Sequence, residues 1–172
     1  PKTMLAPPEL RAVHPLGKSP VITDGGNVVA ESGAIIEYLI ERDGGGRFVP
    51  APGTADKRRF TYFLHYAEGS AMPPLLMKLV FDKIETAPMP FFVKPVARSI
   101  AQKVKGSFIM PQILQHLAFL EAELGKSTWF AGEEFTAADI QLSFVIEAAA
   151  SRGGLDEKYP KLNAYIQRIH AR

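Results

Sequence analysis

The spacing of hydrophobic residues changes from that of strands to that of helices at Ser32. Before it, two short runs rich in β-branched residues, 20–23 and 28–30, flank a glycine-rich turn and predict a β-hairpin. A short helix over 7–13 precedes them, with prolines in its first turn and just after its end. After Ser32, one helical face carries Ile35, Ile36, Leu39 and Ile40. Residues 1–43 therefore predict helix, hairpin and helix.

Residues 44–55 are the predicted linker between two parts of the chain. They hold four glycines and two prolines around the apolar pair Phe48–Val49. From 56 to 172 the pattern is helical throughout. Apolar spacing in the first long helix is carried by Phe60, Phe63, Leu64, Ala67 and Ala71. The pair Pro73–Pro74 predicts that this helix kinks or ends there.

A capping box at Thr136–Asp139 marks the start of a further helix. In this motif the Thr hydroxyl and the Asp carboxylate satisfy backbone N–H groups of the first turn, so Asp139 has a structural role. The helix that follows, 140–150, has Gln141, Ser143 and Glu147 as its polar residues. A helix that is apolar almost all round belongs in the centre of a bundle. Two more helices are indicated by Ile113, Leu117, Leu120 and Leu124, and by Leu162, Tyr165, Ile166 and Ile169.

Composition and charge exclude several classes of protein. Twenty Lys and Arg against 18 Asp and Glu give a net charge of +2, too small for a non-specific nucleic-acid binder. There is no cysteine, which excludes disulfides and thiolate metal sites within this sequence. The four histidines have no ligand spacing, so no metal site is predicted. Apolar stretches fall short of the roughly 20 residues of a membrane span.

Three motifs, in order along the chain, resemble the glutathione S-transferase family. His14–Ile22 is similar to the family's N-P-x-G-x-V-P-x-L segment, which precedes its third strand. Glu31–Ile35 resembles the E-S-x-A-I segment that opens its third helix, and Phe135–Ile140 resembles the F-T-x-A-D-I box. The resemblance implies an α+β, thioredoxin-like but incomplete glutathione-binding domain at 1–43 and an all-α helical-bundle domain at 56–172.

The resemblance also implies a glutathione site beside the hairpin. In the family the bond equivalent to that between Ser19 and Pro20 is cis, and the backbone there pairs with the cysteinyl part of glutathione. Glu31 and Ser32 lie at a helix start, where they can bind the ammonium and carboxylate of a γ-glutamyl group. Lys18 is a candidate for the glycyl carboxylate. The alternatives are that Ser32 is an ordinary N-cap and that Glu31 and Lys18 are simply solvated.

Further candidates lie along the first long helix of the predicted helical domain. The resemblance makes Glu68 a candidate for contact with glutathione across the subunits of a homodimer, with a solvated face as the alternative. Tyr66, Met72 and Leu76 are candidates to line an apolar pocket for an electrophile, because Met and aromatic side chains adapt to irregular ligands. Packing in the core is their alternative role.

The function implied is that of a cytoplasmic, homodimeric detoxification enzyme that adds the thiolate of glutathione, its co-substrate, to small and largely apolar electrophiles. The thiol has a pKa of roughly 8.5 and must be deprotonated, which the family achieves with a Tyr, Ser or Cys near its first strand. We expect that residue, and the β-α-β segment that carries it, to lie upstream of these residues, so no catalytic residue is assigned. The alternatives are a glutathione-dependent peroxidase or disulfide reductase and a non-catalytic, transferase-like interaction module.

Overall fold

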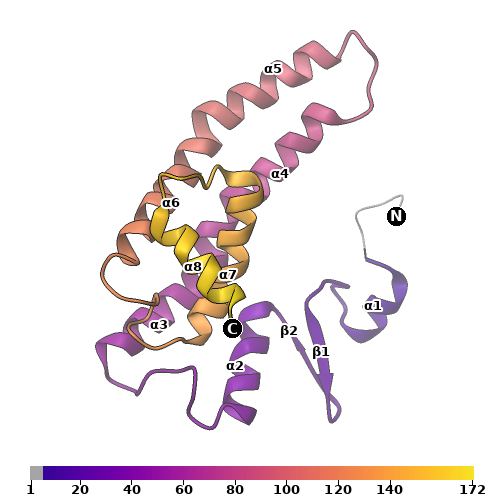
Figure 1. Cartoon of the computed structure of the whole chain (residues 1–172). Coiled ribbons are helices and arrows are strands. Elements are labelled where there is room, and N and C mark those ends of the chain that lie inside the picture. Colours follow the sequence, from indigo (N-terminus) through magenta and orange to yellow (C-terminus); the bar gives the residue numbers. More distant parts are fainter. Residues whose placement is uncertain (1–5) are drawn as a thin grey trace.

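The computed structural model describes residues 6–172 and confirms a helix, a hairpin and a helix in the N-terminal part (Figure 1). These elements are α1 (Pro8–Val13), β1 (Val21–Asp24), β2 (Asn27–Ala30) and α2 (Ser32–Asp43). The two strands pair antiparallel, with Val21 opposite Ala30 at the end that leads into α2. Residues 1–5 of the predicted N-terminal domain lie outside the described residues.

A glycine makes the turn between α1 and β1 possible. Gly17 has φ +57°, and a Cβ placed there would lie 2.5 Å from Cγ of Arg11. A side chain is therefore disfavoured both by the backbone conformation and by the close approach. The turn leads directly to the bond between Ser19 and Pro20, which is cis, and from there into β1.

Helix α2 holds the hairpin through one carboxylate. The hydroxyl of Tyr38 donates a hydrogen bond of 2.6 Å to Oδ2 of Asp24, and Arg42 forms an ion pair with the same group. Because Asp24 ends β1, these contacts from α2 anchor the turn end of the hairpin.

The buried part of α2 is narrower than the apolar face that the sequence predicts. Ile35 is buried, and Ile36 and Ile40 pack against the core. Leu39 belongs to the predicted apolar face but is exposed. On the helix Leu39 lies between Ile35 and Ile36, but no element within residues 6–172 covers it.

The second part of the chain is helical, as predicted (Figure 1). Its α-helices are α3 (Ala55–Tyr66), α4 (Met72–Thr86), α5 (Lys94–Val104), α6 (Met110–Glu123), α7 (Ala137–Ala148) and α8 (Pro160–His170). Three π-helical turns join or extend them: η1 (Ala67–Ala71), η2 (Lys105–Ile109) and η3 (Ala149–Gly153).

Prolines account for the positions of η1 and η2. Pro73 and Pro74 lack the N–H group that would bond to the carbonyl four residues back. Just before them the helix widens, and the N–H of Met72 bonds to the carbonyl of Ala67, five residues earlier. The predicted kink or end is thus a π turn between two α-helices. Pro111, just after η2, has the same relation to its π turn.

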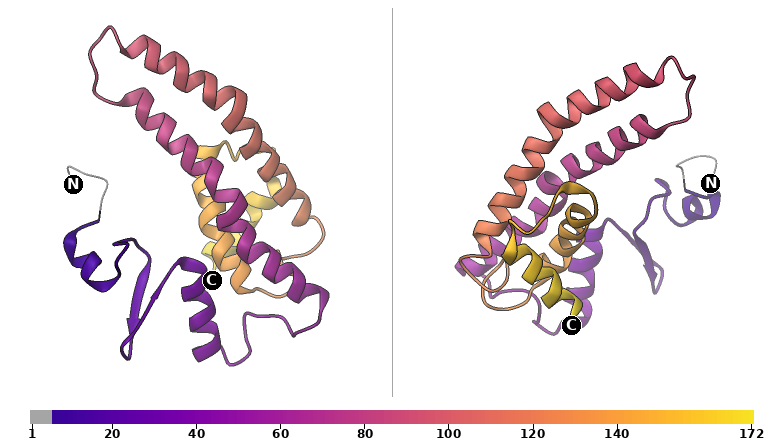
Figure 2. Two further views of the ribbon diagram at one scale, coloured as in Figure 1. Left: turned by 180° about the vertical axis from the view of Figure 1, so that it is seen from behind. Right: turned by 45° about the horizontal axis from the view of Figure 1, so that its top comes forward.

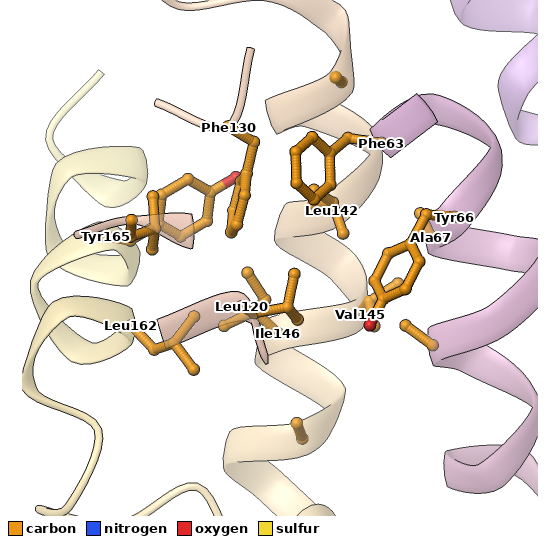
Figure 3. Close-up of a cluster of buried hydrophobic side chains, with 14 of the residues drawn as sticks. Phe63, Tyr66, Ala67, Leu120, Phe130, Leu142, Val145, Ile146, Leu162 and Tyr165 are labelled. Carbon is orange, nitrogen blue, oxygen red and sulfur yellow. The ribbon is translucent and has the colours of Figure 1, made fainter. Parts of the chain in front are cut away.

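The core lies among α3, α6, α7 and α8, where large side chains meet between the helices (Figure 3). Tyr165 from α8 packs edge-on against Phe130 at 5.1 Å between ring centroids, and Phe130 lies 5.1 Å from Phe63 of α3. The labelled residues of the cluster are Phe63, Tyr66, Ala67, Leu120, Phe130, Leu142, Val145, Ile146, Leu162 and Tyr165. Burial of this apolar surface is the main stabilising contribution to the helical part.

The predicted central helix, α7, is central but not buried on all sides. Leu142, Val145 and Ile146 are buried, whereas Phe144 is 63% exposed. The polar Gln141, by contrast, is only 3% exposed. The prediction of a helix buried all round was therefore wrong for one face.

The capping box that starts α7 is confirmed. The fully buried carboxylate of Asp139 accepts hydrogen bonds from the backbone N–H groups of Phe130 (3.0 Å) and Thr136 (2.9 Å), and from the Thr136 hydroxyl (3.0 Å). Burial raises the pKa of Asp139, and these hydrogen bonds oppose that rise. The hydroxyl of Tyr165 donates to the backbone carbonyl of the same residue at 2.8 Å. One aspartate therefore joins the start of α7, the preceding loop and α8.

The linker attaches the N-terminal part to the start of α7. The N–H of Ala137 donates a hydrogen bond of 2.9 Å to the carbonyl of Phe48, whose φ of 66° is in the left-handed region. The Phe48 ring packs edge-on against Phe135. The apolar pair Phe48–Val49 therefore anchors the linker to the helical part, since Val49 also packs against the core.

Helices α4 and α5 form a long antiparallel hairpin that projects beyond the other helices (Figure 2). Ion pairs join α4 to α5 and to the start of η2: Glu85 pairs with Arg98 of α5, and Lys105 Nζ of η2 lies 2.7 Å from Oδ1 of Asp82 and 2.5 Å from Oε2 of Glu85. Leu76, Val80 and Ile84 of α4, and Val96 and Ile100 of α5, are exposed. Their four-residue spacing puts each stripe on the side of its own helix away from the ion-pairing residues.

No helix within residues 6–172 is long and apolar enough to cross a membrane.

Asp139→Asn should lower the free energy of unfolding by roughly 2–4 kcal/mol. The amide keeps one acceptor oxygen but turns an NH₂ group toward a buried donor that the carboxylate now satisfies. Urea denaturation followed by circular dichroism measures the change. Glu134→Gln, at an exposed residue of the loop before α7, is the matched control. A loss below about 0.5 kcal/mol in Asp139→Asn, the range of ordinary surface substitutions, would contradict this role.

Candidate functional site

The first turn of α2 is an uncapped helix start. Glu31 is the N-cap residue, and its side chain makes no capping hydrogen bond. The first backbone hydrogen bond of the helix runs from the N–H of Ile35 to the carbonyl of Glu31. The N–H groups of Ser32, Gly33 and Ala34 therefore have no partner in the helix. Such a turn, with no acidic residue in it, favours an anion.

Glu31 takes an unusual backbone conformation at this point. Its φ of 74° and ψ of 129° lie outside the regions that non-glycine residues normally occupy. Strain of this kind is typical of binding and catalytic sites. The side chain is exposed, and its carboxylate has no ion pair within residues 6–172. Ser32 is the first helical residue, so the alternative in which Ser32 is the N-cap does not hold.

The bond between Ser19 and Pro20 is cis, as the resemblance implies. Lys18, Ser19 and Pro20 line a small cavity of about 90 Å³ together with Glu31. The chain on either side brings them there: the Gly17 turn lies before them and β1 follows. Four of the five residues predicted for glutathione binding therefore meet at one place.

A second, larger cavity of about 510 Å³ lies between α2 and the helical part. Glu31 lines this cavity as well, so the two are neighbours at that residue. Ser32 lines it from α2, and Glu68 from η1. The cavity thus joins the fifth predicted residue, Ser32, to the candidate from the first long helix. A still larger cavity of about 620 Å³, beside the linker and the loop before α7, contains none of the predicted residues.

Gln141 is a residue of this cavity that sequence reasoning did not single out as a site residue. Its Nε2 donates hydrogen bonds to Oγ of Ser32 at 2.8 Å and to Oε1 of Glu68 at 3.0 Å. The amide therefore connects α2, η1 and α7 at the wall of the cavity. The available signal was a lone amide on a helix otherwise rich in apolar residues.

Glu68 lies on the π turn η1, which places it beside Ser32 of its own chain through Gln141. It is exposed, and its neighbour Gly69 lines the same cavity. π turns inside helices are frequent at functional sites. Contact between Glu68 and a ligand in another subunit remains a prediction.

The three residues predicted for an apolar pocket are not brought to this cavity. Tyr66 is buried in the core, where its hydroxyl lies 2.5 Å from Nδ1 of His116. Met72 is partly buried against the core, and Leu76 is exposed on α4. Burial raises the pKa of Tyr66, with a smaller contribution from Tyr62. A pocket role for these three residues stays a prediction.

Metal-ligating side chains do not gather in the described part of the chain. Within residues 6–172, no three His, Asp or Glu side chains lie close enough to hold a metal ion. The polar groups at the cavities are carboxylate, hydroxyl, amide and backbone N–H groups, together with the ammonium of Lys18 and the imidazoles of His14 and His65. This set can bind a zwitterionic ligand, with its anionic end at α2 and its cationic end at Glu31.

Comparison with known protein families gives two matches. Residues 1–47 match the family model of the glutathione S-transferase N-terminal domain, and residues 81–172 match that of the C-terminal domain.

Individual relatives agree with the family models. The chain is 29% identical to glutathione S-transferase 1 of Saccharomyces cerevisiae, over 95% of this chain and 74% of that protein. A crystal structure of a glutathione S-transferase from Actinobacillus pleuropneumoniae has a TM-score of 0.73 and 30% identity, covering 97% of this chain and 70% of that one. A sphingomonad glutathione S-transferase complexed with glutathione has a TM-score of 0.69 and 26% identity, covering 94% and 72%.

His116 predicts a pH dependence of stability. Burial lowers the pKa of His116 in the folded protein below its ordinary value near 6.5. The unfolded chain then binds the proton more strongly, so this contribution to stability is complete above about pH 6.5 and is lost as the pH falls through the folded pKa. We expect His116→Gln to lose less of its unfolding free energy between pH 7.5 and pH 5 than the wild type.

Urea denaturation at both pH values measures this difference. His65→Gln, at an exposed histidine of α3, should keep the wild-type loss. An unchanged pH dependence in His116→Gln would contradict the assignment.

Proposed function

The chain belongs to the glutathione S-transferase family and is an enzyme of that family, and from this premise we propose that it binds glutathione at the two cavities that meet at Glu31. Its reaction is the addition of the glutathione sulfur to small electrophiles. Glutathione serves as the co-substrate, and the site needs no metal. The sphingomonad relative, whose structure is complexed with glutathione, supports this assignment.

The observation that carries the proposal is the uncapped start of α2 beside an unpaired carboxylate. A γ-glutamyl group presents a carboxylate and an ammonium on one carbon. The free N–H groups of the first turn, together with the hydroxyl of Ser32, suit the carboxylate. The carboxylate of Glu31 suits the ammonium. The two charged groups are then recognised by adjacent residues.

The rest of the tripeptide extends toward the cis bond. We propose that the backbone at Ser19 and Pro20 pairs with the cysteinyl part and that Lys18 reaches the glycyl carboxylate. Lys18 is exposed and has no ion pair within the described residues. Its place in the cavity that also contains Glu31 supports this orientation of glutathione.

The electrophile is proposed to be small and largely apolar. Leu76 and Met72, at the surface and the edge of the core on α4, are candidates to contact it, and Tyr66 is a further candidate from α3. We also propose the cytoplasm as the compartment and a division into 1–43, 44–55 and 56–172. Detoxification is the role that such a reaction serves.

We further propose a homodimer formed through the α4–α5 hairpin. Each helix of this hairpin carries an exposed apolar stripe on the side away from its ion-pairing residues. An exposed two-helix apolar surface of this kind is typical of an interaction site. In such a dimer, Glu68 is the candidate for contact with glutathione of the other subunit.

Substituting the two residues at the start of α2 tests the glutathione site. Ser32→Ala and Glu31→Ala should each raise the Kd for glutathione about 10-fold, since each removes a hydrogen bond to a charged group. Isothermal titration of glutathione into the purified protein measures the change. Ser99→Ala, on the exposed surface of α5, should leave the Kd unchanged. Wild-type affinity in both α2 variants would exclude this site.

Val80→Glu tests the dimer. A carboxylate in the middle of the apolar stripe would have to be buried unpaired, which should shift the protein toward the mass of one chain. Sedimentation velocity or light scattering measures the mass. Gln115→Glu, an exposed position on α6, should keep the wild-type mass. A wild type with the mass of a single chain, or a Val80→Glu variant still at twice that mass, would contradict the proposed interface.

A further inference from the structure

The buried side-chain amide of Gln141 links Ser32 to the helical part. Its role follows from the two hydrogens that it can donate. Gln141 is 3% exposed, and its Nε2 is 2.8 Å from Oγ of Ser32 and 3.0 Å from Oε1 of Glu68. An amide NH₂ group has two hydrogens, and this geometry uses one for each oxygen. The orientation of the amide is also set by charge, because its own oxygen would face an anionic acceptor if it were turned toward Glu68.

The consequence for Ser32 is a defined role for its hydroxyl. A hydroxyl has one hydrogen to donate and two lone pairs to accept with. Gln141 donates to one lone pair, so the hydrogen of Ser32 is left to point elsewhere. The free N–H groups of the first turn of α2 lie next to it, and the residues that carry them, Ser32, Gly33 and Ala34, line the same cavity. The serine hydrogen can therefore join them as a donor to one carboxylate.

We propose that Gln141 is a positioning residue for glutathione binding: it holds Ser32 as a hydrogen-bond donor toward the ligand carboxylate and keeps Glu68 at the wall of the cavity. This inference rests on the proposed function, because it concerns the site where glutathione is proposed to bind. Gln141 affects glutathione affinity through Ser32, while Glu68 accepts the second amide hydrogen and so fixes the orientation of the amide. Contact with the ligand is not required of Gln141.

The position of the amide is held firmly by the fold. Gln141 follows Asp139 by two residues, so the buried capping box fixes the helix turn from which the amide projects. Helix α7 packs against both α2 and α3, and these contacts set the distance between its amide and Ser32. A donor held in place by the core loses little entropy when the ligand binds.

Replacement by glutamate reverses the role of the side chain without changing its shape. In Gln141→Glu the carboxylate can only accept, so Ser32 would donate to it and lose its hydrogen for the ligand. The new charge would also lie beside Glu68 and near the ligand carboxylate. Two close carboxylates raise the pKa of one of them, so the variant should regain a neutral, donating carboxyl group as the pH falls.

Isothermal titration of glutathione into the full chain, at pH 7.5 and at pH 5.5, tests the proposal. We expect the Kd at pH 7.5 to rise about 5-fold in Gln141→Met and at least about 10-fold in Gln141→Glu. Relative to the wild type, Gln141→Glu should recover affinity at pH 5.5, and Gln141→Met should not. In a Ser32→Ala background, Gln141→Met should change the Kd less than about 2-fold, because the serine through which it acts is gone.

The outcomes separate the positioning role from the binding site itself. Glutathione binding by the wild type with unchanged affinity in both Gln141 variants would overturn the role of Gln141 and leave the proposed function intact. Equal losses from Gln141→Met with and without Ser32 would also overturn it, since the amide would then act by general packing. Absence of glutathione binding by the wild type would overturn both. If Gln141→Met does not fold, the pH recovery of the isosteric Gln141→Glu decides the question.

Discussion

The buried carboxylate of Asp139 is the constraint on which most of the architecture depends. It accepts three hydrogen bonds from Phe130 and Thr136, while the carbonyl of the same residue receives the hydroxyl of Tyr165. Helix α7 therefore starts at one fixed point relative to α8 and the loop before it. Without those donors, the same burial would leave an uncompensated charge in the core.

Hydrogen bonds from the start of α7 connect this fixed point to the linker and to the cavity. Ala137 binds the carbonyl of Phe48 and so holds the linker, and Gln141 reaches Ser32 on the other side of the junction. The N-terminal part is small and has a single two-stranded sheet among its described residues, which alone gives little stability. Its attachment to α7 is consequently as important to the site as the site residues themselves.

Local patterns made much of this fold predictable. The hairpin around the glycine turn, the boundaries of α2 and the capping box each depend on residues close together in the sequence. Exposure on α2 and α7 was less predictable: Leu39 and Phe144 have the apolar character of core residues, but no element within residues 6–172 covers them. Periodicity identifies an apolar face, whereas the neighbours decide how wide the buried stripe becomes.

The candidate site likewise combines residues that could be identified from the sequence with one that only the packing of the helices reveals. The segments at Ser19–Pro20 and at Glu31, where we propose that glutathione binds, were found through a family resemblance, because a cis bond and a positive φ leave little trace in composition. Gln141 could not be paired with Ser32 from sequence, since 109 residues separate them and only the packing of α7 on α2 brings them together. The sequence shows polar residues in a mostly apolar helix, but it does not identify which of them is buried or with which partner.

In the proposed site, the uncapped first turn of α2 links ligand occupancy to the stability of the fold. A carboxylate seated on its free N–H groups takes the place that a capping side chain occupies in most helices. Anything that binds there stabilises the folded state by mass action, in proportion to the logarithm of its concentration above its Kd. The free energy of local unfolding of the N-terminal part then rises with the concentration of the ligand, above the value that its own sequence provides.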